Sequence, residues 1–193
     1  MIRQTWFVTG AASRLGADIV RQALAQGHQV VAADVDPLAA LRRIGDAADV
    51  RLLALALDEV DAAGVGAAVK AAVARFGAVD VLVHGAADCS PLHEFDRPPA
   101  PRDFSASVRA LFNVTRGALE AMREQCGGRI LHLVPAPDRR RGPALFSIAG
   151  FCEAVAADVA PFGIEVAAVP AHQAMTLLEP ASASDRDEVL EEA

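Results

Sequence analysis

Short apolar runs alternate along the chain with longer segments whose apolar residues recur every three or four positions. The short runs have the length of buried strands, and the longer segments have the period of helices that pack one face against a sheet. The predicted strands are Thr5–Thr9, His28–Ala33, Val50–Leu57, Asp80–Val83, Arg129–Val134 and Ile164–Val169. The predicted helices are Ala17–Gln26, Pro37–Ile44, Val60–Arg75, Phe104–Gln125 and Phe146–Val159. This alternation predicts an α/β protein with a doubly wound parallel sheet of about six strands.

Glycine and proline mark the segments between these elements. The four prolines of Ser90–Arg102 predict a loop rather than a domain linker. A chain of 193 residues is long enough for one sizeable core, so we expect a single domain over residues 1–176. Residues 177–193 are rich in Asp and Glu and predict an acidic tail, either an exposed helix or a frayed end.

Composition narrows the classes of partner. The hydrophobic fraction of 53% excludes a chain disordered by composition, and charged residues or glycines interrupt every apolar run before it could span a bilayer. A formal net charge of −7 argues against nucleic acid as a general partner. The three cysteines are widely spaced, and the first residues carry no basic-then-apolar leader. We therefore expect reduced thiols, a cytoplasmic location and no membrane partner.

A glycine-bearing turn, TGAASRLG, joins the first predicted strand to the first predicted helix. In a βαβ unit, a turn at this point presents the N–H groups of the helix N-terminus to the pyrophosphate of a dinucleotide. Two glycines alone are a weak signal. The order of the segments that follow strengthens it.

These segments resemble, in order and spacing, those of the short-chain dehydrogenase/reductase (SDR) family. The turn is close to the family's TGxxxGxG, with Arg14 in the middle glycine slot. The segment FGAVDVLVHGAAD resembles FGxxDxLVNNAG, and FNVTRGALEAM resembles the family's long interface helix. GGRILHLV and GIEVAAVPA resemble its fifth and sixth strands. The resemblance covers roughly residues 5–176 and implies a three-layer Rossmann fold, shortened before the seventh strand of the family.

The resemblance also implies a cofactor site for NAD or NADP. Asp34 stands where the family places an acid that binds the adenosine ribose of NAD, and its charge would repel the 2′-phosphate of NADP. Arg14 favours the opposite choice, because some NADPH-dependent members carry arginine in this slot. We expect NAD rather than NADP, if a dinucleotide binds; the alternative is a preserved fold with a degraded pocket. The implied cofactor-binding residues are Thr9, Gly10, Ser13, Arg14, Leu15, Gly16, Asp34, Asp58 and Gly85.

The catalytic residues of the family are missing. SDR enzymes use a tyrosine acid, a lysine that lowers the tyrosine pKa, a serine and an asparagine. This chain has no tyrosine, and its only lysine, Lys70, lies in the predicted helix between the third and fourth strands. The four family positions fall on Arg141, Leu145, Pro135 and Ser107. We therefore expect a degenerate member, with no family-type catalytic residue and no metal site.

Three histidines could replace the missing groups, because each is predicted near the carboxyl end of a strand: His84, His132 and His172. No pair has the spacing of helical metal ligands, and isolated histidines are more often packed side chains. The run Arg139–Arg141 could hold an anion, but a solvated loop is the simpler interpretation.

Three hypotheses for function remain open at this stage. The favoured one is a catalytically inactive nucleotide-binding, structural or regulatory subunit. The second is an NAD(P)-dependent oxidoreductase with an atypical active site, and the third is a fold that has lost its ligand. In the SDR family the helices that correspond to 104–125 and 146–159 pack against a second subunit, and both have apolar faces here. The resemblance therefore implies a homodimer, a homotetramer or a hetero-oligomer with an active SDR.

Overall fold

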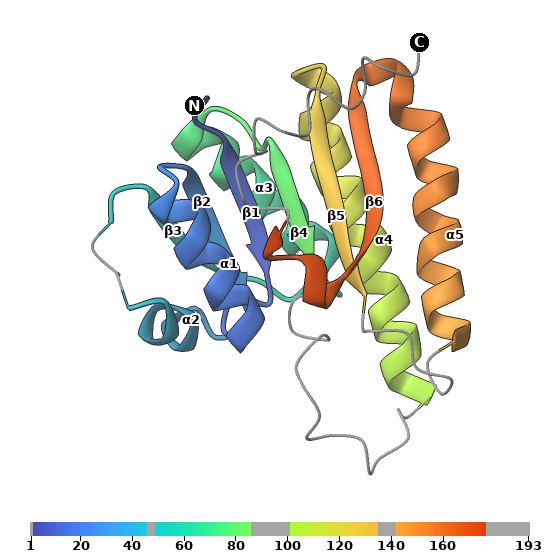
Figure 1. Ribbon diagram of the computed structural model, residues 1–193, viewed down its shortest axis with the longest axis horizontal. Helices are drawn as coiled ribbons and strands as arrows, with labels where there is room; N and C mark the ends of the chain where they lie inside the picture. Colours follow the sequence, from blue (N-terminus) through green and yellow to red (C-terminus); the bar gives the residue numbers. More distant parts are fainter. Residues whose placement is uncertain (1, 46–48, 86–100, 135–141, 177–193) are drawn as a thin grey trace, which may run out of the picture.

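The computed structural model describes residues 2–45, 49–85, 101–134 and 142–176, and these ranges form one parallel sheet with helices on both faces (Figure 1). The six strands have the order β3-β2-β1-β4-β5-β6. The strands are β1 (Thr5–Thr9), β2 (Gln29–Asp34), β3 (Leu52–Ala56), β4 (Val81–His84), β5 (Gly128–Val134) and β6 (Ile164–Pro170). The helices are α1 (Arg14–Ala25), α2 (Pro37–Ile44), α3 (Ala62–Phe76), α4 (Pro101–Glu124) and α5 (Gly142–Val159), with short 3-10 turns at Ala160–Phe162 and Ala171–Gln173. The predicted Rossmann fold is confirmed.

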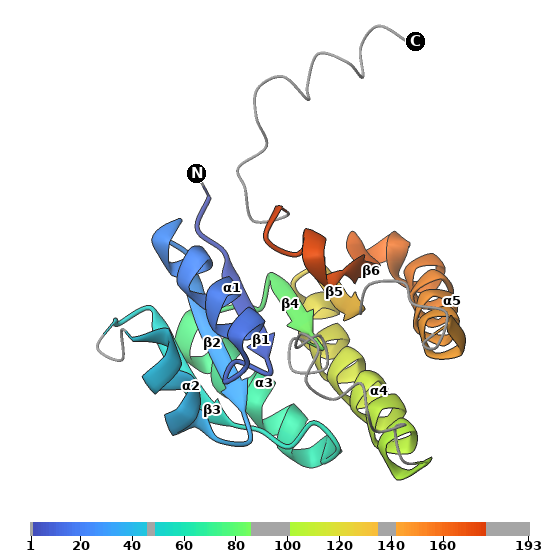
Figure 2. The ribbon, with the colours of Figure 1, turned by 60° about the horizontal axis from the view of Figure 1, so that its bottom comes forward.

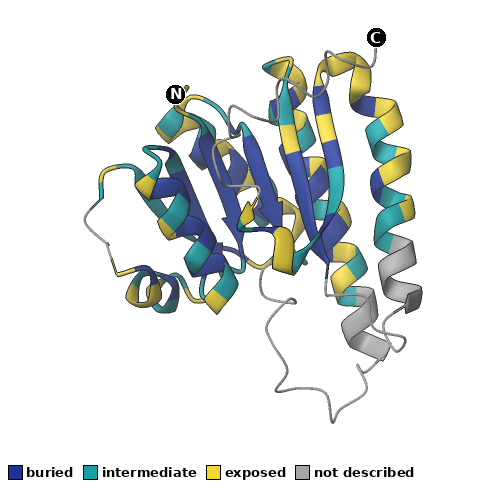
Figure 3. Ribbon diagram, in the orientation of Figure 1, coloured by how far each residue is buried: buried dark blue, intermediate teal, exposed yellow. Residues whose placement is uncertain are grey.

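Two separate apolar clusters hold the three layers together. Helices α1 and α2 cover one face of the sheet over β1 to β3, whereas α3, α4 and α5 cover the other face (Figures 1 and 2). Alternation along β1 serves both clusters, because Trp6 and Val8 join the first and Phe7 joins the second. The central strands are consequently buried on both faces, as the dark blue strands in Figure 3 show.

Strand order creates the place where a ligand can bind. The chain runs from β1 outward through β2 to β3, and then crosses back to β4 on the other side of β1. The connections after β1 and β4 therefore diverge at the carboxyl edge of the sheet. An open α/β sheet binds its ligands at such a reversal of strand order.

Most element boundaries differ from prediction by only a few residues, and each larger shift has a local cause. Helix α1 begins at Arg14 rather than Ala17, because the Ser13 side chain caps it by accepting the N–H of Gly16. Helix α3 begins at Ala62 rather than Val60, because Asp61 caps it in the same way through Ala63.

The later helices are longer than predicted. Helix α4 starts at Pro101, inside the segment predicted as loop, and proline is well suited to a first helical position. Helix α5 starts at Gly142 rather than Phe146. The predicted acidic tail, residues 177–193, lies outside the described residues and stays a prediction. None of the helices in the described ranges is both long and apolar enough to cross a membrane.

Helices α3 and α4 touch through a position that has no side chain. A Cβ added at Gly117 of α4 would lie 2.8 Å from Cγ1 of Val65 on α3. A Cβ added at Gly66, the next residue of α3, would meet nothing within 4 Å. The two glycines therefore form a matched pair, one at a tight helix contact and one at an open site.

We expect Gly117→Ala to lower the free energy of unfolding by about 1 kcal/mol, because overpacking outweighs the gain in helix propensity. Gly66→Ala should raise it by roughly 0.5–1 kcal/mol, because only the propensity changes. Urea unfolding followed by circular dichroism measures both. Equal stabilisation by the two substitutions would contradict the described packing of α3 on α4.

Candidate functional site

The turn after β1 is held to the sheet by the residue that ends β2. Oδ2 of Asp34 accepts the N–H of Ala12 at 2.9 Å, and the Ala33 carbonyl accepts the N–H of Ala11 at 3.2 Å. Gly16 packs against the start of the same turn so closely that a Cβ there would overlap the carbonyl oxygen of Gly10. These contacts fix the turn and the first residues of α1 in one arrangement.

The N-terminus of α1 fits the phosphates of a dinucleotide. Ser13 uses its hydroxyl for the N–H of Gly16 and its carbonyl for the N–H of Ala17. For the N–H groups of Arg14 and Leu15, the structure describes no acceptor among its residues. The first turn of α1 has no acidic residue, and the Arg14 side chain is exposed beside it. Free N–H groups and the positive end of the helix dipole favour an anion at this point.

Asp34 keeps acceptor capacity for a ribose. Its Oδ2 binds Ala12 and its Oδ1 accepts the N–H of Asp36 at 3.1 Å, so each oxygen has taken one of the two bonds that it can accept. The residue is half-buried at the end of β2. Asp58 is exposed beyond the end of β3, and its Oδ1 accepts the N–H of Val60 at 2.9 Å. Both predicted acids therefore lie at the carboxyl edge of the sheet, and Asp34 also contacts the turn after β1.

Gly85, the last predicted cofactor-binding residue, follows β4 at the same edge. It is buried, has a φ of 92° and lies so close to β5 that a Cβ would come 2.9 Å from the carbonyl oxygen of Leu133. Only glycine takes this conformation without strain. All nine predicted residues thus lie at the carboxyl ends of four strands, β1 to β4, or at the start of α1.

Two of the three candidate histidines meet inside the protein. His84 and His132 are register partners on β4 and β5, and their Nδ1 atoms lie 3.0 Å apart. Nε2 of His132 lies 3.0 Å from Oγ1 of Thr115, a buried residue of α4. The Thr115 hydroxyl in turn donates to the carbonyl of Leu111 at 2.7 Å. Burial, with the neighbouring His84 ring adding to it, holds the pKa of His132 well below its usual range.

Glu59 extends this line of polar side chains toward the surface. Its Oε1 lies 3.8 Å from Nε2 of His84, and 28% of its side chain is exposed. Burial raises the pKa of the Glu59 carboxyl, and the charges of Asp34 and Asp58 act in the same direction, while the Thr9 hydroxyl partly opposes them. The result is a continuous line from α4 to the carboxyl edge, formed by Thr115, His132, His84 and Glu59.

Sequence reasoning missed Glu59 and Thr115. Glu59 directly follows Asp58. It lies near His84 because of the path that the backbone takes after β3, which no local sequence pattern predicts. Asn113 of α4 fixes that path, because its side-chain amide donates to the carbonyls of Glu59 at 3.0 Å and Val60 at 2.9 Å. A polar residue at the buried face of α4 was the one available signal for Thr115.

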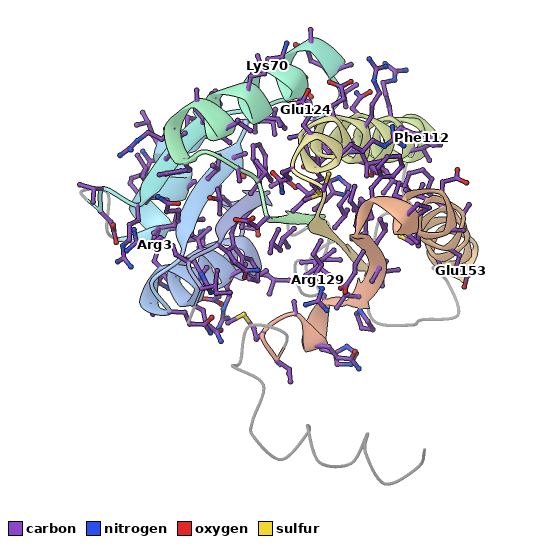
Figure 4. All side chains as sticks on the ribbon, turned by 90° about the horizontal axis from the view of Figure 1, so that it is seen from above. Arg3, Lys70, Phe112, Glu124, Arg129 and Glu153 are labelled. Carbon is purple, nitrogen blue, oxygen red and sulfur yellow. The ribbon has the colours of Figure 1, made fainter. Side chains whose placement is uncertain are left out.

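The other candidates do not join this site. His172 is exposed in the turn after β6, and Ser107, at the family's asparagine position, is exposed on α4. Lys70 lies on the outer surface of α3 (Figure 4). Arg141, Pro135 and the run Arg139–Arg141 lie outside the described residues, as does the side chain of Leu145. Within the described ranges, no three metal-ligating side chains come together.

The fold and the edge site define an α/β protein of the dinucleotide-binding class. The pattern of the family described as short chain dehydrogenase matches residues 4–136. The chain therefore belongs to the SDR family.

The curated relatives are oxidoreductases by name. Oxidoreductase BOA17 of Botryotinia fuckeliana is 28% identical over 184 residues, which cover 91% of this chain and 64% of the relative. Galactitol 2-dehydrogenase of Agrobacterium fabrum is 31% identical over 156 residues, which cover 78% of this chain and 58% of the relative. The chain thus spans less than two thirds of the length of these relatives. Such relatives support an oxidoreductase-type SDR better than the inactive subunit favoured from the sequence.

Solved structures agree on the family. A short-chain dehydrogenase from Streptomyces avermitilis superposes with a TM-score of 0.71 at 27% identity, over 88% of this chain and 65% of that one. A 3-ketoacyl-(acyl-carrier-protein) reductase from Brucella melitensis, solved with NADH, has a TM-score of 0.66 at 27% identity, over 86% and 74% of the two chains. SDR proteins bind NAD or NADP, and these likenesses do not distinguish the two.

The buried His132 makes a testable contribution to the pH dependence of stability. Because its folded pKa lies below its unfolded value of 6.5, the unfolded chain binds the extra proton as pH falls through 6.5. The stability that His132 contributes is therefore fully present above pH 6.5 and is lost as pH falls toward its folded pKa. Each such proton changes the free energy of unfolding by up to about 1.4 kcal/mol per pH unit.

We expect the melting temperature of His132→Asn to fall less than that of the original protein as the pH is lowered from 7 to 5. Thermal melts across that range measure the difference in slope, and exposed His172→Asn is the matched control. Parallel slopes for His132→Asn and the original chain would show that His132 titrates alike in the folded and unfolded states.

Proposed function

We propose that this protein is an NAD(P)-dependent oxidoreductase of the SDR family with an atypical active site. The observation that carries the proposal is the N-terminus of α1, where the N–H groups of Arg14 and Leu15 and a first turn without acids face the edge of the sheet. The oxidoreductase names of the relatives support the class of reaction. The likeness to a reductase solved with NADH supports the class of cofactor.

The dinucleotide, when bound, supplies or accepts a hydride at its nicotinamide ring. The chain's own residues would bind and orient it at the carboxyl edge of the sheet. The start of α1 would hold the pyrophosphate, Asp34 would accept hydrogen bonds from the adenosine ribose, and Asp58 would lie beside the adenine. Gly85, whose lack of a side chain lets it pack against Leu133 of β5, would line the cofactor site at the same edge.

We propose NAD as the preferred cofactor. Asp34 stands at the end of β2 with both oxygens directed at backbone N–H groups, so its carboxylate is fixed in place. A fixed negative charge favours the two hydroxyls of the NAD ribose and disfavours the phosphate of NADP. Arg14 lies exposed at the start of α1 and would offset part of that repulsion.

A non-catalytic nucleotide-binding subunit is the second candidate function. It is favoured by one specific observation, the complete absence of tyrosine from the chain. Without a phenol, the family's usual proton donor cannot form. The two candidates agree on dinucleotide binding and differ only in turnover, which makes turnover the decisive measurement. For both candidates, a cytoplasmic location and the absence of a nucleic-acid partner stay predictions.

The proposed partner surface is the groove between α4 and α5. The groove has a volume of about 430 Å³, and its apolar lining includes Phe112, Leu119, Phe151 and Val155. Phe112 is 55% exposed on α4, beside α5 in Figure 4, and its ring meets that of Phe151 edge to face at 4.8 Å. We propose that a second copy of this chain, or an active SDR, packs against this groove.

Asp34→Asn tests the cofactor proposal. We expect it to weaken NAD binding about tenfold and to narrow the preference for NAD over NADP, because a charged acceptor becomes neutral. Asp36→Asn is the matched control: it removes the same charge two residues away, and asparagine caps α2 equally well. Titration calorimetry with NAD, NADH, NADP and NADPH measures all three proteins. No binding of any dinucleotide to the original chain would overturn the proposal.

Turnover separates the two candidate functions. We expect NADH oxidation with a panel of sugar ketones and ketoacyl thioesters, classes that the names of the relatives suggest. Tight dinucleotide binding with no turnover on any member of the panel would support the non-catalytic subunit instead.

Phe112→Asp tests the partner surface. A charge in the centre of an apolar contact should shift the protein toward monomer, with at least a tenfold weaker self-association, because an unpaired carboxylate would be buried. Leu38→Asp on α2 is the control, because Leu38 is 64% exposed on the opposite side of the sheet. Sedimentation velocity over a range of concentrations measures the change. Equal effects of the two substitutions would place the contact elsewhere.

A further inference from the structure

The connection between β3 and α3 is held in place by hydrogen bonds along its length. The Leu57 N–H donates to the carbonyl of Asp34 at 2.9 Å, so the connection starts against the residue that ends β2. Oδ1 of Asp58 accepts the N–H of Val60 at 2.9 Å, and the Asp58 carbonyl accepts the N–H of Asp61 at 3.0 Å. The two acids proposed for the adenosine half of the cofactor, Asp34 and Asp58, are therefore joined through this connection.

Two carbonyls in the middle of the connection are bound from outside it. The side-chain amide of Asn113, on α4, donates to the carbonyl of Glu59 at 3.0 Å and to that of Val60 at 2.9 Å. The amide has two hydrogens, so Asn113 uses both of them on adjacent peptide groups. Helix α4 lies close to α3 here, because Gly117, one turn further along, has no side chain to meet Val65.

We propose that Asn113 is a positioning residue for recognition of the adenine ring. The proposal rests on the proposed dinucleotide-binding function, in which Asp58 lies beside the adenine. Leu57 fixes the start of the connection to β2, and Asn113 fixes its middle to α4. The exposed Asp58 lies between these two anchors, so the direction of its carboxylate depends on both.

The chemistry of adenine gives the placement of Asp58 a measurable consequence. A carboxylate accepts hydrogen bonds, and the 6-amino group of adenine donates them. Hypoxanthine has an oxygen at the same position, and that oxygen can only accept, so it repels a carboxylate beside it. A correctly placed Asp58 therefore favours NAD over nicotinamide hypoxanthine dinucleotide, and a displaced Asp58 loses that preference.

The first test compares the affinities for NAD and for nicotinamide hypoxanthine dinucleotide by titration calorimetry. We expect Asn113→Ala to weaken NAD binding about tenfold and binding of the hypoxanthine analogue by no more than about twofold, because only the 6-amino group needs a placed carboxylate. Gln125→Ala is the matched control. The Gln125 amide also donates to two carbonyls, those of Val79 at 2.9 Å and Gly127 at 2.8 Å, but at the amino edge of the sheet. Its loss should leave both affinities unchanged.

A double substitution separates positioning from a general loss of structure. In Asp58→Ala the carboxylate is absent, so Asn113 has nothing left to place. We expect Asn113→Ala to weaken NAD binding by less than about twofold in that background, against about tenfold in the original chain. Equal losses in the two backgrounds, or equal losses for NAD and its hypoxanthine analogue, would overturn the positioning role.

The second test uses the protein without cofactor and reports the anchor itself. Amide hydrogen exchange followed by NMR measures the N–H of Val60, which binds Asp58, and the N–H of Ala12, in the turn after β1. We expect Asn113→Ala to speed exchange at Val60 by at least about tenfold and to leave Ala12 unchanged. Gln125→Ala should change neither. The same spectra show whether each variant is folded.

If Asn113→Ala does not fold, Asn113→Asp replaces it in both tests. The aspartate keeps the shape of the side chain but directs acceptors at the two carbonyls, so we expect the same faster exchange and the same lost preference for adenine. Unchanged exchange at Val60 in a folded variant would overturn the anchor. If the original chain binds neither dinucleotide, the proposed function fails and the adenine role fails with it, while the exchange rates still decide whether Asn113 holds the connection.

Discussion

The site depends on one constraint, the parallel register of neighbouring strands. Because all six strands run in the same direction, their carboxyl ends meet at one edge, and the connections after β1 and β4 separate there. The same register places His84 opposite His132, so two residues 48 positions apart share a hydrogen bond. A shift of one residue in that pairing would turn one ring to the other face of the sheet and break the polar line.

The cofactor half of the site was predictable because it depends on local chemistry. Gly16 and Ser13 lie in one turn, and their roles as a close contact and a helix cap follow from short spacings that a sequence displays. Asp34 could be assigned to the cofactor site because it stands at the end of a predicted strand. The fold was predictable for a similar reason, since strand and helix periods repeat along the whole chain.

The line of polar side chains from Thr115 to Glu59 was only partly predictable. The histidines at strand ends were visible in the sequence, but their pairing required the order of β4 and β5. Glu59 and Thr115 come from a loop and a helix far apart in the chain, and only the tertiary path brings them to His84. Absence of the tyrosine predicted inactivity, whereas the names of the relatives favour an oxidoreductase-type SDR.

Asn113 stands next to the groove-lining Phe112 and also holds the backbone that precedes α3. Its amide clamps the backbone of Glu59 and Val60 from one side of α4, and the neighbouring Phe112 projects from the same turn into the groove. If a subunit docks on the outer surface of α4 and makes this helix more rigid, the Glu59 backbone and its carboxyl group are held more firmly as well. One turn of α4 therefore borders both the groove and the backbone that carries Glu59.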